Sequence, residues 1–378
     1  MILLRSLVRK GAAGVLIQVA GLMLSLLSTI VLARCLGPKF LGIYSSSFAL
    51  LSLFLVAADS GVSTLFIRDG ATYLKNKNSG LLSGLIQWGL LRVFIVSVGI
   101  LFLGLVVIFL LKFNDYQRFF TNAVMLFALP PAVLLKSIGH LLRTLDAPLS
   151  SMVLDKVIRP TLFICICASV FVFPSVRAPV IPMIAQFGSA CVCLIISTGL
   201  LNRLLPPNLF KEESCYDLKN WKKSSFLFMA MGGVGVLNSN ADLVLIDFLA
   251  SSRDVGLYRI AVQGATLVSL GLQTMNIIVS PKIAGAFAER NFVRMQQLVL
   301  TSSRFSTLIA AVAFIIFYAT GTPLIDSIFS VEYEESLKPL IWLSIGQLIN
   351  AIMGPVGFLL KITGNEKSLH RFLGLLLV

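Results

Sequence analysis

The chain has 378 residues, of which 57% are hydrophobic and 13% charged, and its formal net charge is +14. A soluble domain carries about 25% charged residues, so this composition and a mean hydropathy of +0.92 exclude a water-soluble globular protein. The basic residues lie in short connections between apolar runs, which excludes a nucleic-acid-binding domain and is typical of a membrane protein.

A helix needs about 20 apolar residues to cross the hydrocarbon core of a bilayer. The first such run is longer than the apolar part of a signal peptide, so we interpret it as a retained span. In chain order the runs predict ten membrane-spanning helices, at residues 11–33, 43–67, 88–111, 119–142, 153–173, 178–201, 225–249, 256–281, 305–329 and 337–361. Residues 369–378 are too few to cross, so we expect the chain to stop inside an eleventh helix.

The loops give an independent test of orientation. With the N-terminus placed in the cytoplasm, more than two thirds of the 31 Lys and Arg residues fall on the cytoplasmic side. That imbalance fits the positive-inside rule and predicts a cytoplasmic N-terminus. Eight basic residues would lie outside: Arg34, Lys39, Lys112, Arg118, Arg177, Arg253, Arg259 and Lys338.

The connections are too short to fold as separate domains. The longest, about residues 202–224, is charged and would face the cytoplasm. This excludes an attached nucleotide-binding or glycosyltransferase domain, and no phosphate-binding glycine motif follows a strand. Two histidines and cysteines buried in apolar runs predict neither a metal site nor a cofactor. Function must therefore reside among the membrane helices, and we do not expect an enzyme.

A weak internal repeat divides the chain. Residues 31–44 are echoed by residues 244–258, and each segment ends on a Gly-x-Tyr sequence that opens the next span, Gly42–Tyr44 and Gly256–Tyr258. A repeat of about 215 residues that contains six spans gives both copies the same orientation in the membrane, an arrangement found in transporters. We therefore expect an all-α, two-lobed helical bundle, with a six-helix lobe at residues 1–205 and a shortened second lobe at 206–378 that lacks its last helices.

Several spans contain polar side chains, which cost several kcal/mol at membrane depth unless they face protein or water. In the fourth span, Lys136, His140 and Arg143 share one helical face. Such a basic face suits a substrate that bears phosphates. The other candidates are Asp59, Arg92, Asn238, Asn240, Asp242, Gln347 and Asn350.

These residues also allow simpler interpretations. Arg92 and Arg143 lie near the cytoplasmic ends of their spans, where long basic side chains reach lipid headgroups. Asn and Gln side chains often only bond neighbouring helices. Asp59 and Asp242 are harder to explain in this way, because a carboxylate gains nothing from an anionic lipid surface.

The chain resembles the polysaccharide-unit (O-antigen type) flippases of the multidrug/oligosaccharidyl-lipid/polysaccharide exporter superfamily. The matching segments are Leu32–Tyr44, Asp59–Gly61 with Arg68, Asp242 with Val255–Tyr258, and Thr363–Lys367. The resemblance implies two six-helix bundles around a hydrophilic cavity and alternating access. It also implies a bacterial inner-membrane location and a lipid-linked oligosaccharide substrate, linked through undecaprenyl diphosphate, that is moved from the cytoplasmic to the outer leaflet. It allows a polysaccharide polymerase as a partner.

On this interpretation Lys136, Arg143 and Arg92 attract the diphosphate. Asp59 and Asp242 pair with cations or sense a coupling ion, whereas Asn238 and Asn240 bond sugar hydroxyls. Three alternatives stay open: a drug/cation antiporter of the same superfamily, a membrane glycosyltransferase or polymerase, and an inactive shortened remnant.

Overall fold

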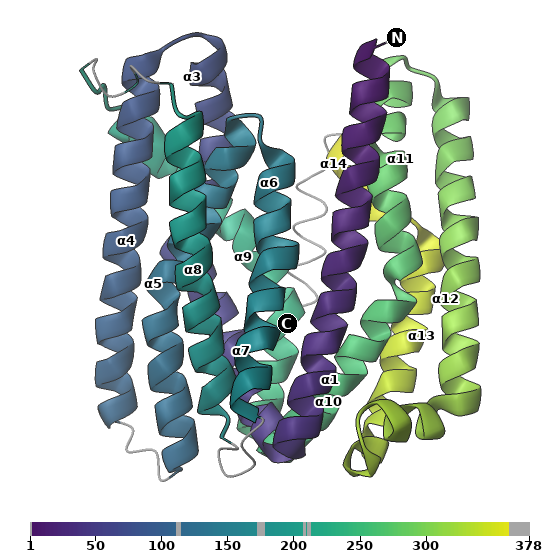
Figure 1. Ribbon diagram of the computed structural model, residues 1–378. Helices are drawn as coiled ribbons and strands as arrows, with labels where there is room; N and C mark the ends of the chain where they lie inside the picture. Colours follow the sequence, from purple (N-terminus) through teal and green to yellow (C-terminus); the bar gives the residue numbers. More distant parts are fainter. Residues whose placement is uncertain (1, 111–114, 172–177, 207–208, 210–212, 363–378) are drawn as a thin grey trace. The chain divides into compact units, whose positions relative to one another are not determined.

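A computed structural model describes residues 2–110, 115–171, 178–206, 209 and 213–362. Helices joined by short connections make up this part of the chain, and it contains no strand (Figure 1), which confirms the all-α prediction. The elements are α1 (Ile2–Asp59), α2 (Val62–Leu65), η1 (Phe66–Gly70), α3 (Ala71–Lys75), α4 (Ser79–Leu110), α5 (Tyr116–Thr144), α6 (Pro148–Val153), η2 (Leu154–Ile158), α7 (Arg159–Phe171), α8 (Val180–Leu204), α9 (Leu218–Leu249), α10 (Ser252–Val268), α11 (Leu270–Ala288), α12 (Phe292–Ile328), η3 (Val331–Ser336), α13 (Leu337–Met353) and α14 (Val356–Ile362).

Six of these helices are long and apolar enough to cross a membrane, or seven if the bent pair α10–α11 is one span. The first of them, α1, is two helices joined at Gly37, whose φ of 74° and ψ of 171° interrupt the helix just before Pro38. The predicted span 11–33 lies within the first half of α1. The predicted span 43–67 begins in the second half, but it runs past the end of α1 at Asp59 into α2 and η1. The α10–α11 pair bends by 45° within the predicted span 256–281. The number of ten spans stays a prediction, and the partial eleventh helix at 369–378 and the Thr363–Lys367 segment lie outside the described residues.

The helices group into two compact units. One contains residues 16–36 and 43–248, and the other contains residues 1–15, 37–42 and 249–378. We call them the α5 unit and the α12 unit after their central helices. The lobe boundary predicted at residue 205 stays a prediction.

In the α5 unit, α5 packs against α4 and α8, and α7 packs against α8 (Figure 1). Small hydroxyl side chains lie fully buried in these helices, among them Ser83, Ser97, Ser137 and Ser189. Small residues let helix backbones approach closely where lipid supplies no hydrophobic driving force. Large apolar side chains such as Phe109 and Ile195 are instead exposed, at 76% and 71%, as expected for a lipid-facing surface.

In the α12 unit, α12 packs between α11 and α13, and α10 packs on α13. The two Gly-x-Tyr segments of the repeat meet here. A Cβ atom at Gly42 would lie 1.6 Å from the carbonyl oxygen of Ser252, and one at Gly256 would lie 2.0 Å from the carbonyl oxygen of Pro38. Both glycines are buried in helical segments. The missing Cβ of each glycine therefore makes room for backbone of the other copy.

The start of α9 is fixed to the α5 unit. The Trp221 side chain is fully buried, its ring lies 5.5 Å from that of Trp88, and its Nε1 donates to the Tyr73 hydroxyl at 3.2 Å. One turn further on, the Ser225 hydroxyl donates to the Ser60 carbonyl at 2.5 Å. These contacts hold the first two turns of α9 next to the turn that ends α1.

Candidate functional site

The candidate site starts from the sharp turn that ends α1. Ser60 and Gly61 have φ values of 49° and 75°, in the left-handed region that favours glycine. A Cβ atom at Gly61 would also lie 2.2 Å from the Ser225 carbonyl oxygen, so glycine is required there by both torsion and space. The turn leaves Asp59 as the last residue of α1, three residues ahead of the first residue of the short helix α2, Val62.

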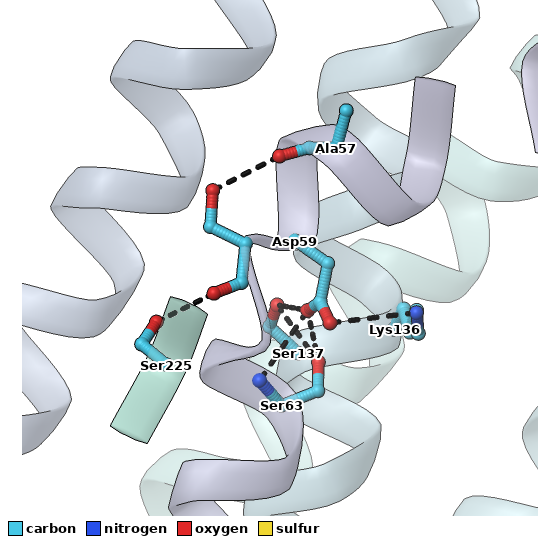
Figure 2. Close-up of polar contacts among 7 residues, drawn as sticks. Ala57, Asp59, Ser63, Lys136, Ser137 and Ser225 are labelled. Carbon is cyan, nitrogen blue, oxygen red and sulfur yellow. Dashed lines mark hydrogen bonds and ion pairs between the residues drawn. The ribbon is translucent and has the colours of Figure 1, made fainter. Parts of the chain in front are cut away.

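Asp59 lies at the centre of a small polar network that joins this turn to α5. Its buried carboxylate accepts hydrogen bonds from the backbone N–H of Ser63 at 3.3 Å, from the Ser63 hydroxyl, and from the Ser137 hydroxyl at 3.4 Å. The second oxygen pairs with Lys136 Nζ at 3.5 Å. Figure 2 shows the carboxylate facing these groups. Asp59 therefore accepts a backbone hydrogen bond at the start of α2 and forms an ion pair with Lys136.

Beyond Lys136, the α5 face predicted from the sequence opens on a cavity of about 250 Å³. We call it the cationic pocket and define it by Lys136, His140, Arg143 and Arg159, the last from the start of α7. Asp155 is the carboxylate on its wall, and Ser151 and Ser197 add hydroxyls. The i, i+4, i+7 spacing on α5 therefore does place three side chains in one hollow.

Several polar atoms of the cationic pocket are buried without a hydrogen-bond partner among the described residues. They are His140 Nδ1, Arg159 Nε and Ser197 Oγ. A buried polar atom left unpaired costs about 1–3 kcal/mol. Arg143 Nε donates to Ser151 Oγ at 3.2 Å, and Arg159 Nη2 reaches Gln186 Oε1 at 3.4 Å. The basic side chains of Lys136, Arg143 and Arg159 nevertheless line one hollow, which is suited to an oxygen-rich anion.

Arg159 and Asp155 line the pocket but were not among the residues predicted from the sequence. They precede the apolar part of the predicted span 153–173, and nothing in the sequence assigned them a role beyond interrupting the start of that span. Residues 154–158 form a π-helix, η2, directly before α7, and residues of η2, α5 and the start of α7 line the same pocket. A basic residue just ahead of an apolar run, close to a basic face on the preceding span, was the available signal.

Two further candidate cations lie elsewhere in the α5 unit. Arg68 is in the π-helix η1, half exposed, and bonds Asp69 at 2.5 Å and the Ser224 hydroxyl at 3.0 Å. Its hydrogen bond to Asp69 raises the pKa of the guanidinium further. Arg92, on α4, stacks over the Trp88 ring at 5.1 Å and keeps Nη1 buried without a partner among the described residues. Neither residue lines the cationic pocket.

The polar residues of α9 also lie away from this pocket. Asn238 is exposed, Asn240 Nδ2 donates to its own helix at the Val236 carbonyl, and Asp242 accepts from the Leu243 N–H at 2.8 Å. Their roles stay predictions. In the α12 unit, Asn350 Nδ2 lies 3.5 Å from Gln347 Oε1 on α13, so these two candidates contact each other.

A second polar cluster joins the opposite end of α5 to α9. Arg118, expected in an exterior loop, lies in the first turn of α5, and its Nη2 pairs with Asp247 Oδ1 at 2.6 Å. Nearby, the Ser47 hydroxyl donates to Asn122 Oδ1 at 2.6 Å. Both partners of the ion pair are largely shielded, at 25% and 17% side-chain exposure. Asp247 was not predicted, because it stands at the end of an apolar run.

The sequence profile of the polysaccharide biosynthesis protein family matches residues 7–285. The chain belongs to this family. The family lies within the multidrug/oligosaccharidyl-lipid/polysaccharide exporter superfamily and is a family of transporters, which confirms the predicted resemblance. A search of curated proteins returns no match.

Solved structures of the superfamily share the fold of this family member. A multidrug resistance MATE transporter in an inward-facing conformation has a TM-score of 0.68 at 13% identity, over 90% of this chain and 83% of that one. A mutant MATE transporter has a TM-score of 0.58 at 16% identity, over 94% and 84%. A superfamily transporter from Pyrococcus furiosus, described as having a binding pocket of reverse polarity, has a TM-score of 0.53 at 14% identity, over 94% and 84%. The chain is thus a multi-pass membrane transporter with a MATE-like fold.

Proposed function

We propose that this transporter flips undecaprenyl-diphosphate-linked oligosaccharide units from the cytoplasmic to the outer leaflet of a bacterial inner membrane. The observation that carries the proposal is the basic lining of the cationic pocket. Family membership supports a role in polysaccharide export, and the pocket supports a diphosphate as the group that is recognised.

The pocket supplies complementary chemistry for a diphosphate. Arg143 and Arg159 present guanidinium N–H groups, which bind phosphate oxygens in pairs, while Lys136 adds a compact charge. A diphosphate in bare hydrocarbon would lose its hydration without compensation. The anion would therefore be bound where the three basic side chains line one hollow.

Asp59 has a positioning role in this proposal. Its carboxylate forms an ion pair with Lys136 and accepts hydrogen bonds from Ser63 and Ser137. A fixed ammonium binds an incoming phosphate without first losing side-chain freedom. Once the unit has been released on the outer face, a polysaccharide polymerase would be its next partner. The N-terminus would face the cytoplasm, as the loop charges predict.

The test removes pocket charge and measures surface polysaccharide. Lys136→Ala, Arg143→Ala and Arg159→Ala should each weaken diphosphate recognition about ten- to a hundredfold, the range for a lost charge-assisted hydrogen bond. Lys222→Ala, an exposed cation on α9, is the matched control and should export normally. Normal polysaccharide from all three pocket variants, at normal protein levels in the membrane, would refute the proposal.

The rival function is a drug/cation antiporter of the same superfamily, and one of the solved structures that share this fold is a multidrug resistance MATE transporter. A cationic substrate needs an acidic site, whereas Lys136, Arg143 and Arg159 outnumber Asp155 on the pocket wall. This charge balance favours an anionic substrate. Drug resistance conferred by the wild-type chain, and lost on Asp155→Asn, would favour the antiporter instead.

A further inference from the structure

The π-helix η2 separates two hollows of the α5 unit. π-helical turns are rare and are frequent at functional sites. Asp155 lines the cationic pocket, Ile158 lines a second hollow, and the buried Leu154 lines both. A single side chain therefore forms part of the wall between the two.

The second hollow is an apolar groove of about 570 Å³ between α6–η2 and α8. We define the apolar groove by Leu149, Val153, Leu154, Ile158, Ile195 and Leu200. Its volume falls within the roughly 300–1,000 Å³ of ordinary ligand pockets. Ile195 is 71% exposed, so the apolar groove is on the lipid-facing surface of the unit. The charged residue on its lining is Arg203, at the end of α8.

We infer that the apolar groove holds the polyprenyl chain of the substrate while the diphosphate occupies the cationic pocket; this rests on the proposed function. A polyprenyl diphosphate joins a doubly anionic group directly to a long apolar chain. A site for the whole molecule needs an anion pocket and an apolar path that adjoin each other, and Leu154 is the point where these two adjoin.

The physics of the bilayer limits what the groove can do. Lipid tails are as apolar as leucine side chains, so moving a polyprenyl chain from lipid into the groove gains little from the hydrophobic effect. The groove instead aligns the chain by packing and brings the diphosphate to the pocket from the membrane side. The test should therefore block the groove rather than alter its polarity.

Gly199 on α8 provides that block. It is exposed on the groove lining, and a Cβ atom there meets nothing within 4 Å, so a large side chain can project into the groove without disturbing the protein. Gly99 on α4 is exposed and equally open, but it lies outside the groove. Gly199→Phe and Gly99→Phe therefore form a matched pair, and Gly199→Leu is a smaller block.

The experiment measures binding of undecaprenyl diphosphate and of inorganic diphosphate to the full-length protein in nanodiscs. Gly199→Phe should weaken undecaprenyl diphosphate binding about five- to a hundredfold, as expected when two groups compete for one packed space. Gly199→Leu should weaken undecaprenyl diphosphate binding by a smaller factor. Both Gly199 variants should bind inorganic diphosphate as wild type does, and Gly99→Phe should bind both ligands as wild type does.

The two hypotheses fail in different ways. The groove assignment is overturned if Gly199→Phe binds undecaprenyl diphosphate as tightly as wild type, or if Gly99→Phe weakens that binding by the same factor. In that case an ordinary lipid chain occupies the groove. The proposed function survives that result provided that Arg143→Ala and Lys136→Ala still weaken inorganic diphosphate binding. If those two variants bind inorganic diphosphate normally, the proposed function fails, and the groove assignment fails with it.

Discussion

Replacing Gly42 by alanine tests the contact between the two Gly-x-Tyr segments. The new Cβ would lie 1.6 Å from the Ser252 carbonyl oxygen and 2.7 Å from its carbonyl carbon, against an ordinary contact distance of about 3.5–4.0 Å. Both obstructing atoms are backbone, so α10 itself must move by roughly 2 Å.

The magnitude follows from two opposing effects. Over-filling a packed interior costs about 1–3 kcal/mol, and a backbone obstruction belongs at or above the top of that range. Alanine recovers about 1 kcal/mol of helix propensity relative to glycine. The net loss of stability is therefore about 2 kcal/mol or more, a fall of roughly 2–4 °C in melting temperature.

The assay is thermal unfolding of purified protein in detergent, with Gly346→Ala as the matched control. Gly346 is in α13 of the same unit, and a Cβ atom there meets nothing within 4 Å. That variant should be more stable than wild type by roughly 0.5–1 kcal/mol. A Gly42→Ala protein that melts with or above Gly346→Ala would show that the two segments do not pack as described.

Three other predictions concern the α5 unit. A double-mutant cycle on Arg118→Ala and Asp247→Ala should give a coupling energy of about 1–3 kcal/mol, because the pair is largely shielded; additive effects on melting temperature would contradict it. Trp221→Ala should destabilise the protein by about 3–5 kcal/mol, since the indole is fully buried, whereas Trp342→Ala, on a side chain that is 75% exposed, should have little effect. With Cys215 as the only thiol, a membrane-impermeant maleimide should label inverted vesicles and spare intact spheroplasts; the reverse pattern would refute the cytoplasmic N-terminus.

Helical periodicity explains what could be predicted from the sequence. The spacing of Lys136, His140 and Arg143 was enough to predict their common face, because an α-helix has a regular repeat. Asp59 was selected on the cost of a carboxylate at membrane depth, and the structure gives it a Lys136 partner.

What could not be predicted depends on irregular backbone and on helices meeting in space. The π-turn at residues 154–158 has no sequence signature, so Arg159 was not placed in the pocket. Arg118 and Asp247 are far apart in the chain and stand at the ends of apolar runs, where charged residues are ordinary. Arg92 was predicted to bind the diphosphate. Its guanidinium instead stacks on the Trp88 ring of the same helix, α4, away from the cationic pocket.

The contact between Gly42 and Gly256 has a consequence for how the duplicated segments can vary. The space that each glycine leaves is filled by backbone from the other copy. A larger residue at either glycine would therefore collide with the main chain of the other copy, however far the surrounding side chains had drifted. The contact ties two positions from opposite halves of the gene to the same residue, because smaller neighbouring side chains do not remove a main-chain obstruction.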